Sequence, residues 1–70
     1  MELHEIPKHP EVTVQLVGTD GNAFAVLGKV RKALRKAGVS QAEIDAFLEQ
    51  AIDGDYDHLL ATCMQWVWVN

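Results

Sequence analysis

The sequence predicts a small α+β domain in the order β-α-α-α-β, with a two-stranded sheet packed against a helical layer. A β-branched alternating segment near the N-terminus and an aromatic, β-branched segment at the C-terminus favour strands, and the residues between them repeat apolar side chains at helical spacing. Seventy residues leave no room for a second core. We therefore expect a single domain over 12–70, preceded by an irregular lead-in over 1–11.

The first strand is predicted over 12–17. Both prolines of the chain lie in the lead-in, where each pushes its preceding residue toward an extended conformation, so we expect residues 1–11 to be irregular or frayed. Alternate residues of the strand share an apolar face that is expected to meet the helices: Val12, Val14 and Leu16. The segment ends in a cluster of turn-forming residues, Gly18–Asn22.

The first helix is predicted over 23–37. Asn22 can cap its first turn, because the Asn side-chain oxygen accepts a hydrogen bond from an unpaired N–H group. The apolar residues fall within about 120° of arc at helical spacing. They are Ala23, Val26, Leu27, Val30, Ala33, Leu34 and Ala37. Gly38 stands where a left-handed residue commonly follows a helix.

The second helix is predicted from the capping box of Ser40 and Glu43 through about Asp53. Its apolar stripe consists of Ile44, Phe47, Leu48, Ala51 and Ile52. Gly54 is expected to end the segment, so a further helix must begin beyond this residue.

The third helix is expected to begin at a cap supplied by Asp55 or Asp57 and to continue to about Gln65. Its apolar face consists of Leu59, Leu60, Cys63, Met64 and Val67. The segment 66–69 combines aromatic and β-branched residues, which favours a strand. We expect this strand to lie beside the first and to face the helices with Val67 and Val69.

Charge is segregated along the chain, although the net charge is −4. Five of the six cations lie in 29–36, on two flanks of the first helix: Lys29, Lys32 and Lys36 on one, Arg31 and Arg35 on the other. Six of the ten acids lie in 43–57 and form a candidate acidic partner face: Glu43, Asp45, Glu49, Asp53, Asp55 and Asp57. The basic face is either a solvated surface, a partner-binding surface or a contact for nucleic-acid phosphates. The acidic chain and the lack of interleaved aromatic or amide side chains argue against nucleic acid.

No catalytic, cofactor or metal site is predicted. The acids of 53–57 resemble the start of a calcium loop, but His58 and Met64 occupy the positions that require Gly and Glu. The turn over 18–22 lacks the spacing of a phosphate-binding loop. The candidate metal ligands or nucleophiles are not ordered into a ligand set or a triad: His4, His9, His58 and Cys63. Capping accounts for Ser40, the sole serine.

The single cysteine, the acidic N-terminal residues and the absence of a run of about 20 apolar residues predict a cytoplasmic protein with no membrane span.

Self-association is expected because a sheet of two strands is marginal and leaves open edges. A homodimer would extend the sheet or pack one face of it against a second copy. We expect Trp66 and Trp68 to differ in exposure, with Trp68 the better candidate for an oligomer interface, since tryptophan is enriched at binding hot spots. The alternative is a tryptophan packed beneath the N-terminal lead-in.

Three segments of the sequence resemble a family of small proteins of unknown function. They are Val-Gln-Leu-Val-Gly-x-Asp-Gly-Asn-Ala-Phe over 14–24, Gly-Asp-Tyr-Asp-His-Leu-Leu over 54–60 and Trp-Val-x-Val over 66–69. Members of this family occur as short genes in bacteria, phages and mobile elements. The resemblance covers about residues 12–69 and implies a setting, without any catalytic residues to transfer.

These observations predict a non-enzymatic interaction protein that acts through protein–protein recognition. In the mobile-element setting it would be a modulator or inhibitor of host machinery, with the acids of Glu43–Asp57 standing in for phosphates. The alternative is a nucleic-acid-binding accessory protein that uses the basic face of the first helix.

Overall fold

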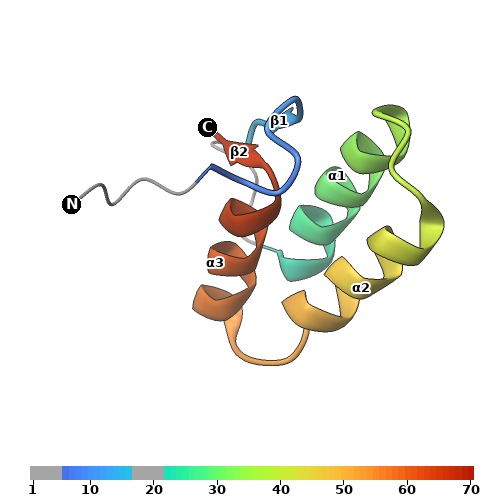
Figure 1. Cartoon of the computed structure of the whole chain (residues 1–70). Helices are drawn as coiled ribbons and strands as arrows, with labels where there is room; N and C mark the ends of the chain where they lie inside the picture. The colour runs from blue at the N-terminus through green and yellow to red at the C-terminus, as the bar shows by residue number, and fades with distance from the viewer. Residues whose placement is uncertain (1–5, 17–21) are drawn as a thin grey trace.

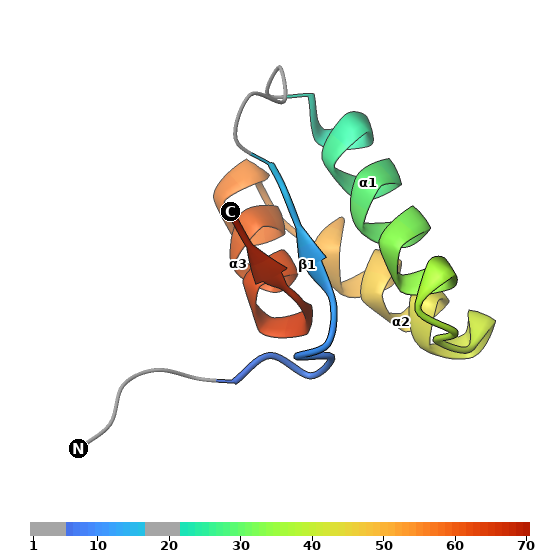
Figure 2. The ribbon, with the colours of Figure 1, turned by 90° about the horizontal axis from the view of Figure 1, so that it is seen from above.

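The computed structural model describes residues 6–16 and 22–70, and in these residues three helices support a two-stranded parallel sheet. The elements are β1 (Thr13–Val14), α1 (Ala23–Lys36), α2 (Gln41–Ala51), α3 (Tyr56–Trp66) and β2 (Trp68–Val69). In Figure 2, β2 lies over α3, and β1 lies between β2 and α1. The α+β class and the β-α-α-α-β order predicted from sequence are confirmed.

The sheet pairs β1 with β2 in the register Thr13 to Trp68 and Val14 to Val69. Backbone hydrogen bonds continue this pairing to Leu16, whose N–H donates to the carbonyl of Asn70 at 2.9 Å. The predicted side-by-side arrangement is therefore confirmed. Val14 of β1 and the residues that precede the two strands, Val12 and Val67, are buried in the core. The predicted last strand residue, Val17, lies outside the described part of the chain.

Helix α1 begins at the predicted residue and ends at Lys36, one residue before the predicted end. The Asn22 side chain accepts a hydrogen bond from the Phe24 N–H at 2.8 Å. After the last helical residue, Lys36, Gly38 adopts a φ of 89°, a conformation that a side chain would strain. Residues 18–21 of the predicted turn are outside the described residues.

Helix α2 is capped by Ser40, which accepts a hydrogen bond from the Glu43 N–H at 3.3 Å. The helix ends at Ala51, two residues before the expected end. The assignment of Ile52 to the apolar stripe was wrong, because this side chain is 64% exposed. At about 100° per residue, Ile52 lies beyond Leu48 on the outer edge of the stripe.

Helix α3 begins at the cap formed by Asp55, whose side chain accepts from the His58 N–H at 2.9 Å. It continues through Trp66, so the placement of this residue in a strand was wrong. The Trp66 ring packs edge-on against Phe47 at 5.6 Å, and its indole N–H donates to the Gln50 side chain at 3.1 Å. Tertiary packing therefore outweighs the strand preference of the aromatic side chain.

The core lies between the helices and the inner face of the sheet. Its largest fully buried side chains are Phe47, Leu34, Ile44, Val26, Val30, Val67 and Cys63. Each helix contributes at least one of them, so no helix is peripheral to folding.

The lead-in is irregular, as predicted, but its described part is not frayed. The N–H groups of Lys8 and His9 donate to the carbonyls of Gln65 and Trp66 at 2.8 and 2.9 Å. These carbonyls lie at the end of α3, where intrahelical partners are lacking. The Val12 N–H then bonds the His9 carbonyl at 3.0 Å, which closes a turn and leads the chain into β1.

Candidate functional site

Glu43 of the candidate acidic face contacts the lead-in. Its Oε1 atom accepts a hydrogen bond from His9 Nε2 at 2.9 Å and lies 3.9 Å from Lys8 Nζ. The same lead-in residues cover Trp66: the His9 ring stacks on the indole at 5.7 Å, and Lys8 Nζ lies 4.5 Å from the ring centroid. Glu43 therefore helps to hold the lead-in against α2 and α3.

The tryptophans differ in exposure, as expected, because Trp66 belongs to α3 and Trp68 belongs to β2. Trp66 is 3% exposed and Trp68 is 44% exposed. Trp66 ends a helix beneath the lead-in, which corresponds to the alternative arrangement, and it is therefore wrong as a candidate for an oligomer interface. Trp68 pairs in the sheet with Thr13, and both are exposed. The homodimer remains a prediction that rests on Trp68.

The basic residues of α1 occupy the flanks expected from the helical wheel. Lys29, Lys32 and Lys36 line a groove beside β1, together with Thr13 and Gln15. Lys29 Nζ donates to the Gln15 carbonyl at 2.9 Å. On the other flank Arg35 donates to Gln41 at 3.3 Å.

Four of the five cations of this helix have no ionic partner in the described part of the chain. Within residues 6–16 and 22–70, no ion pair involves Arg31, Lys32, Arg35 or Lys36. Their charges are therefore available to a partner.

The remaining acids of the candidate acidic face do not act as one unit. Asp45 accepts a hydrogen bond from the Gln41 side chain at 2.9 Å, and Asp55 caps α3. The side-chain carboxylates of the others have no hydrogen bond or ion pair to any residue that the structure describes: Glu49, Asp53 and Asp57.

The contacts of His58 and the burial of Cys63 indicate structural roles for both side chains. The His58 Nε2 donates to the Gln50 carbonyl at 2.8 Å, which ties the start of α3 to α2. Cys63 is fully buried, and burial raises the pKa of its thiol to about 11, above the ordinary value of 9.0. Such a thiol is a poor nucleophile near neutral pH. His4 is outside the described residues, within which no group of three His, Cys, Asp or Glu side chains could hold a metal ion.

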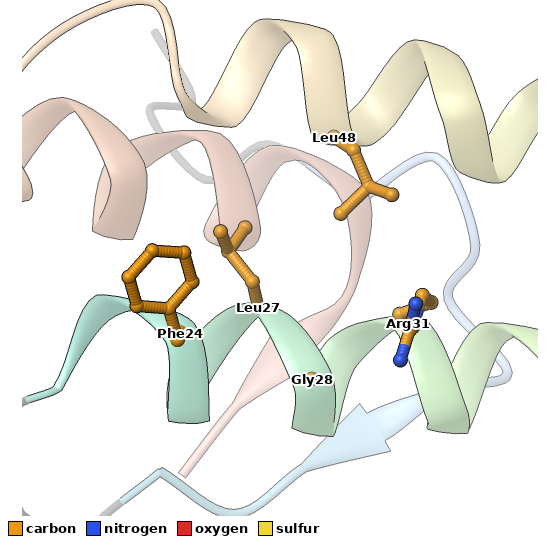
Figure 3. A pocket seen from close by; sticks show the side chains of 5 residues that line it. All are labelled: Phe24, Leu27, Gly28, Arg31 and Leu48. Atoms are coloured by element: carbon orange, nitrogen blue, oxygen red, sulfur yellow. The ribbon is translucent and has the colours of Figure 1, made fainter.

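An exposed apolar surface runs across the helices and was not anticipated as a site. Its first hollow, about 360 Å³, lies between α1 and α2 and is lined by Phe24, Leu27, Gly28, Arg31 and Leu48. Figure 3 shows Leu48 pointing from α2 toward the α1 segment that carries Phe24 and Leu27. Phe24 is 83% exposed, and no described atom would lie within 4 Å of a Cβ added at Gly28.

Two adjoining hollows continue this surface. One shares Phe24 and Leu27 with the first and adds Ile52 and Tyr56, and the next shares Tyr56 and adds Met64. We refer to the exposed residues Phe24, Ile52, Tyr56 and Met64, with the half-buried Leu27, Leu48 and Leu60, as the apolar helix surface. A sequence signal for it exists: Phe24 lies about 60° beyond Leu27 on the helical wheel, outside the stripe that the core uses.

No protein-family model matches the chain, and comparisons with curated proteins and with solved structures found no match. None of the helices in the described residues is sufficiently long and apolar to cross a membrane. Function must therefore be argued from the surfaces themselves.

Proposed function

We propose that this chain is a non-enzymatic interaction protein that acts through protein–protein recognition, with the apolar helix surface as its binding site. The observation that supports this most is the exposure of Phe24 next to Leu27 and Leu48, at the mouth of a hollow between two helices. Contiguous exposed apolar patches on small proteins commonly mark interaction sites. Aromatic anchors such as Phe24 and Tyr56 supply large contact areas at such sites.

The partner proposed for this surface is an amphipathic helix of another protein. The hollow between α1 and α2 has an apolar floor, and the missing side chain of Gly28 leaves room for an inserted apolar residue. Arg31 lines the same hollow and has no ion pair within the described residues. The partner helix should thus carry apolar residues at i, i+3 or i+4 and i+7, with an acidic residue placed to meet Arg31.

Photo-crosslinking tests this proposal. A photoreactive phenylalanine analogue at position 24 or at position 52 is expected to capture the same partner in cells. The analogue at Ala46, an exposed position on α2, is the matched control and should capture little of it. The captured segment should be an amphipathic helix, and Arg31→Glu should reduce its capture about tenfold through like-charge repulsion. Equal capture at all three positions, or capture of an extended segment, would contradict the proposal.

The resemblance to phage and mobile-element proteins supports a host component as the partner and the cytoplasm as the compartment. In that setting the protein would modulate or inhibit host machinery. Glu49, Asp53 and Asp57 are exposed, and their carboxylates have no partner among the described residues. They are therefore the acids that remain available to stand in for phosphates. A salt-sensitive interaction that weakens when these acids are neutralised is the expected sign of such inhibition.

Nucleic-acid binding is the second candidate function. The cations Arg31, Lys32 and Lys36, which have no ion pair with any described residue, favour it. The net charge of −4 opposes it. Fluorescently labelled DNA and RNA at low salt provide the test. If this function holds, reversing Lys32 and Arg35 to Glu should abolish binding and leave crosslinking from position 24 unchanged.

A further inference from the structure

The sheet ends at β1, and the edge of β1 that faces away from β2 has no strand beside it in the described residues. The carbonyls of Val12 and Val14 accept from the N–H groups of Trp68 and Asn70, both at 3.0 Å. Alternate residues of a strand turn their backbone groups to opposite edges. Thr13 and Gln15 therefore direct their N–H and C=O groups away from β2. In Figure 2 this free edge is on the side of α1.

A groove follows this edge and has room for a further strand. A hollow of about 400 Å³ lies between β1 and α1, and another of about 220 Å³ adjoins it. Thr13, Ala33 and Lys36 line both of them. Ala33 is the α1 residue at this point, and its side chain is only a methyl group. A strand at the usual spacing of about 4.8 Å from β1 would therefore pass above a small side chain.

The larger hollow of the groove is basic, whereas Glu11 lines the smaller hollow beside Lys36. Lys29, Lys32 and Lys36 line the α1 side of the larger hollow over two turns of helix. Lys29 Nζ already donates to the Gln15 carbonyl, an acceptor of the free edge. Lys32 and Lys36 have no ion pair with any described residue. An extended segment that occupies this groove should therefore be acidic.

We propose that the free edge of β1 binds an extended acidic segment of a protein partner as a third strand. The partner's backbone pairs with Thr13 and Gln15, and its N–H replaces Lys29 Nζ at the Gln15 carbonyl. Carboxylates of the partner contact Lys32 and Lys36. A second copy of this chain does not fit the same edge, because its own lysines would face these lysines. The site is separate from the apolar helix surface, so each can fail without the other.

The probe is a fluorescein-labelled eight-residue peptide of alternating Val and Glu, followed by fluorescence anisotropy. Thr13→Pro removes an N–H that the fold does not use, at an edge position where proline is tolerated. We expect it to weaken binding about tenfold, the effect of losing one backbone hydrogen bond. Thr13→Ala retains the N–H and is the matched control, with binding unchanged. Lys32→Glu combined with Lys36→Glu should weaken binding about tenfold or more.

A second measurement does not depend on how the variants fold. The same peptide with N-methyl groups on all of its backbone nitrogens has the same charge but offers no N–H group on either edge. It therefore cannot form the ladder, and it should not bind the wild-type chain. Equal binding of the methylated and unmethylated peptides would overturn the proposal. Labelled single-stranded DNA is tested in parallel. DNA that binds the Thr13→Pro and Thr13→Ala chains equally well, while the peptide binds neither, would assign the lysines to nucleic acid instead.

Discussion

Trp66→Ala is expected to unfold most of the protein at 25 °C. Trp66 is 3% exposed, packs on Phe47 and lies beneath His9, and its indole N–H is bonded to Gln50. Truncating a buried tryptophan destabilises a core by about 3–5 kcal/mol. A chain of this size has a total stability of about 3–5 kcal/mol when it lacks disulfides and metals. Circular dichroism with urea titration measures the loss.

Trp68→Ala is the matched control for this prediction, because it removes the same side chain two residues away. Trp68 is 44% exposed, so its truncation should change the free energy of unfolding by about 1 kcal/mol or less. Similar losses for both variants would contradict the packing described for Trp66. The control also tests the predicted homodimer: sedimentation should show Trp68→Ala as a monomer of 7.8 kDa and the wild type as a dimer.

The helix caps were predictable because each depends on a few neighbouring residues. Asn22 and Ser40 accept hydrogen bonds from N–H groups two and three residues ahead, as capping requires. Asp55 does the same for α3. The reciprocal half of the capping box was less predictable, because the Glu43 side chain bonds His9 of the lead-in. Local chemistry thus determines where the helices begin, and a distant residue determines where this side chain goes.

The features that the sequence did not reveal depend on contacts between distant segments. The strand preference of Trp66 is outweighed because Phe47 and Gln50 bring its ring into the core. The described part of the lead-in, 6–11, is held in place because the last carbonyls of α3 need donors, which a reading of its prolines cannot show. The apolar helix surface likewise requires that Phe24 on α1, Ile52 just after α2 and Met64 on α3 lie on neighbouring elements, outside the core.

The basic face was predictable, whereas its division into two sites was not. The helical wheel places Lys32 and Lys36 on a different flank from Arg31, but it does not show which other elements lie beside each flank. The structure places the lysines beside the free edge of β1 and Arg31 beside Phe24 and Leu48. The cations of α1 are therefore assigned to two different proposed partners. The lysines face an extended acidic segment, and Arg31 faces an amphipathic helix.

Cys63 is expected to make the protein unstable in alkali. Desolvation by burial raises the pKa of its thiol from 9.0 to about 11, partly offset by a backbone hydrogen bond at Cys63. Below pH 9 the thiol is neutral in both folded and unfolded chains, and stability is unaffected. Between pH 9 and pH 11 the unfolded chain loses the proton while the folded chain keeps it, so the free energy of unfolding falls as the pH rises. The fall is about 2 kcal/mol at pH 11 and approaches about 3 kcal/mol only above that pH.

Cys63→Ala isolates this contribution, because other groups also titrate in alkali. The variant is less stable than the wild type at pH 8, since it leaves a small cavity in the core. Its stability should nevertheless fall less steeply above pH 9, so that the two urea-unfolding curves converge toward pH 11. Parallel pH dependence of the two chains would show that the buried thiol does not resist ionisation. Convergence would show that the packing which makes Cys63 unreactive also sets the alkaline limit of the fold.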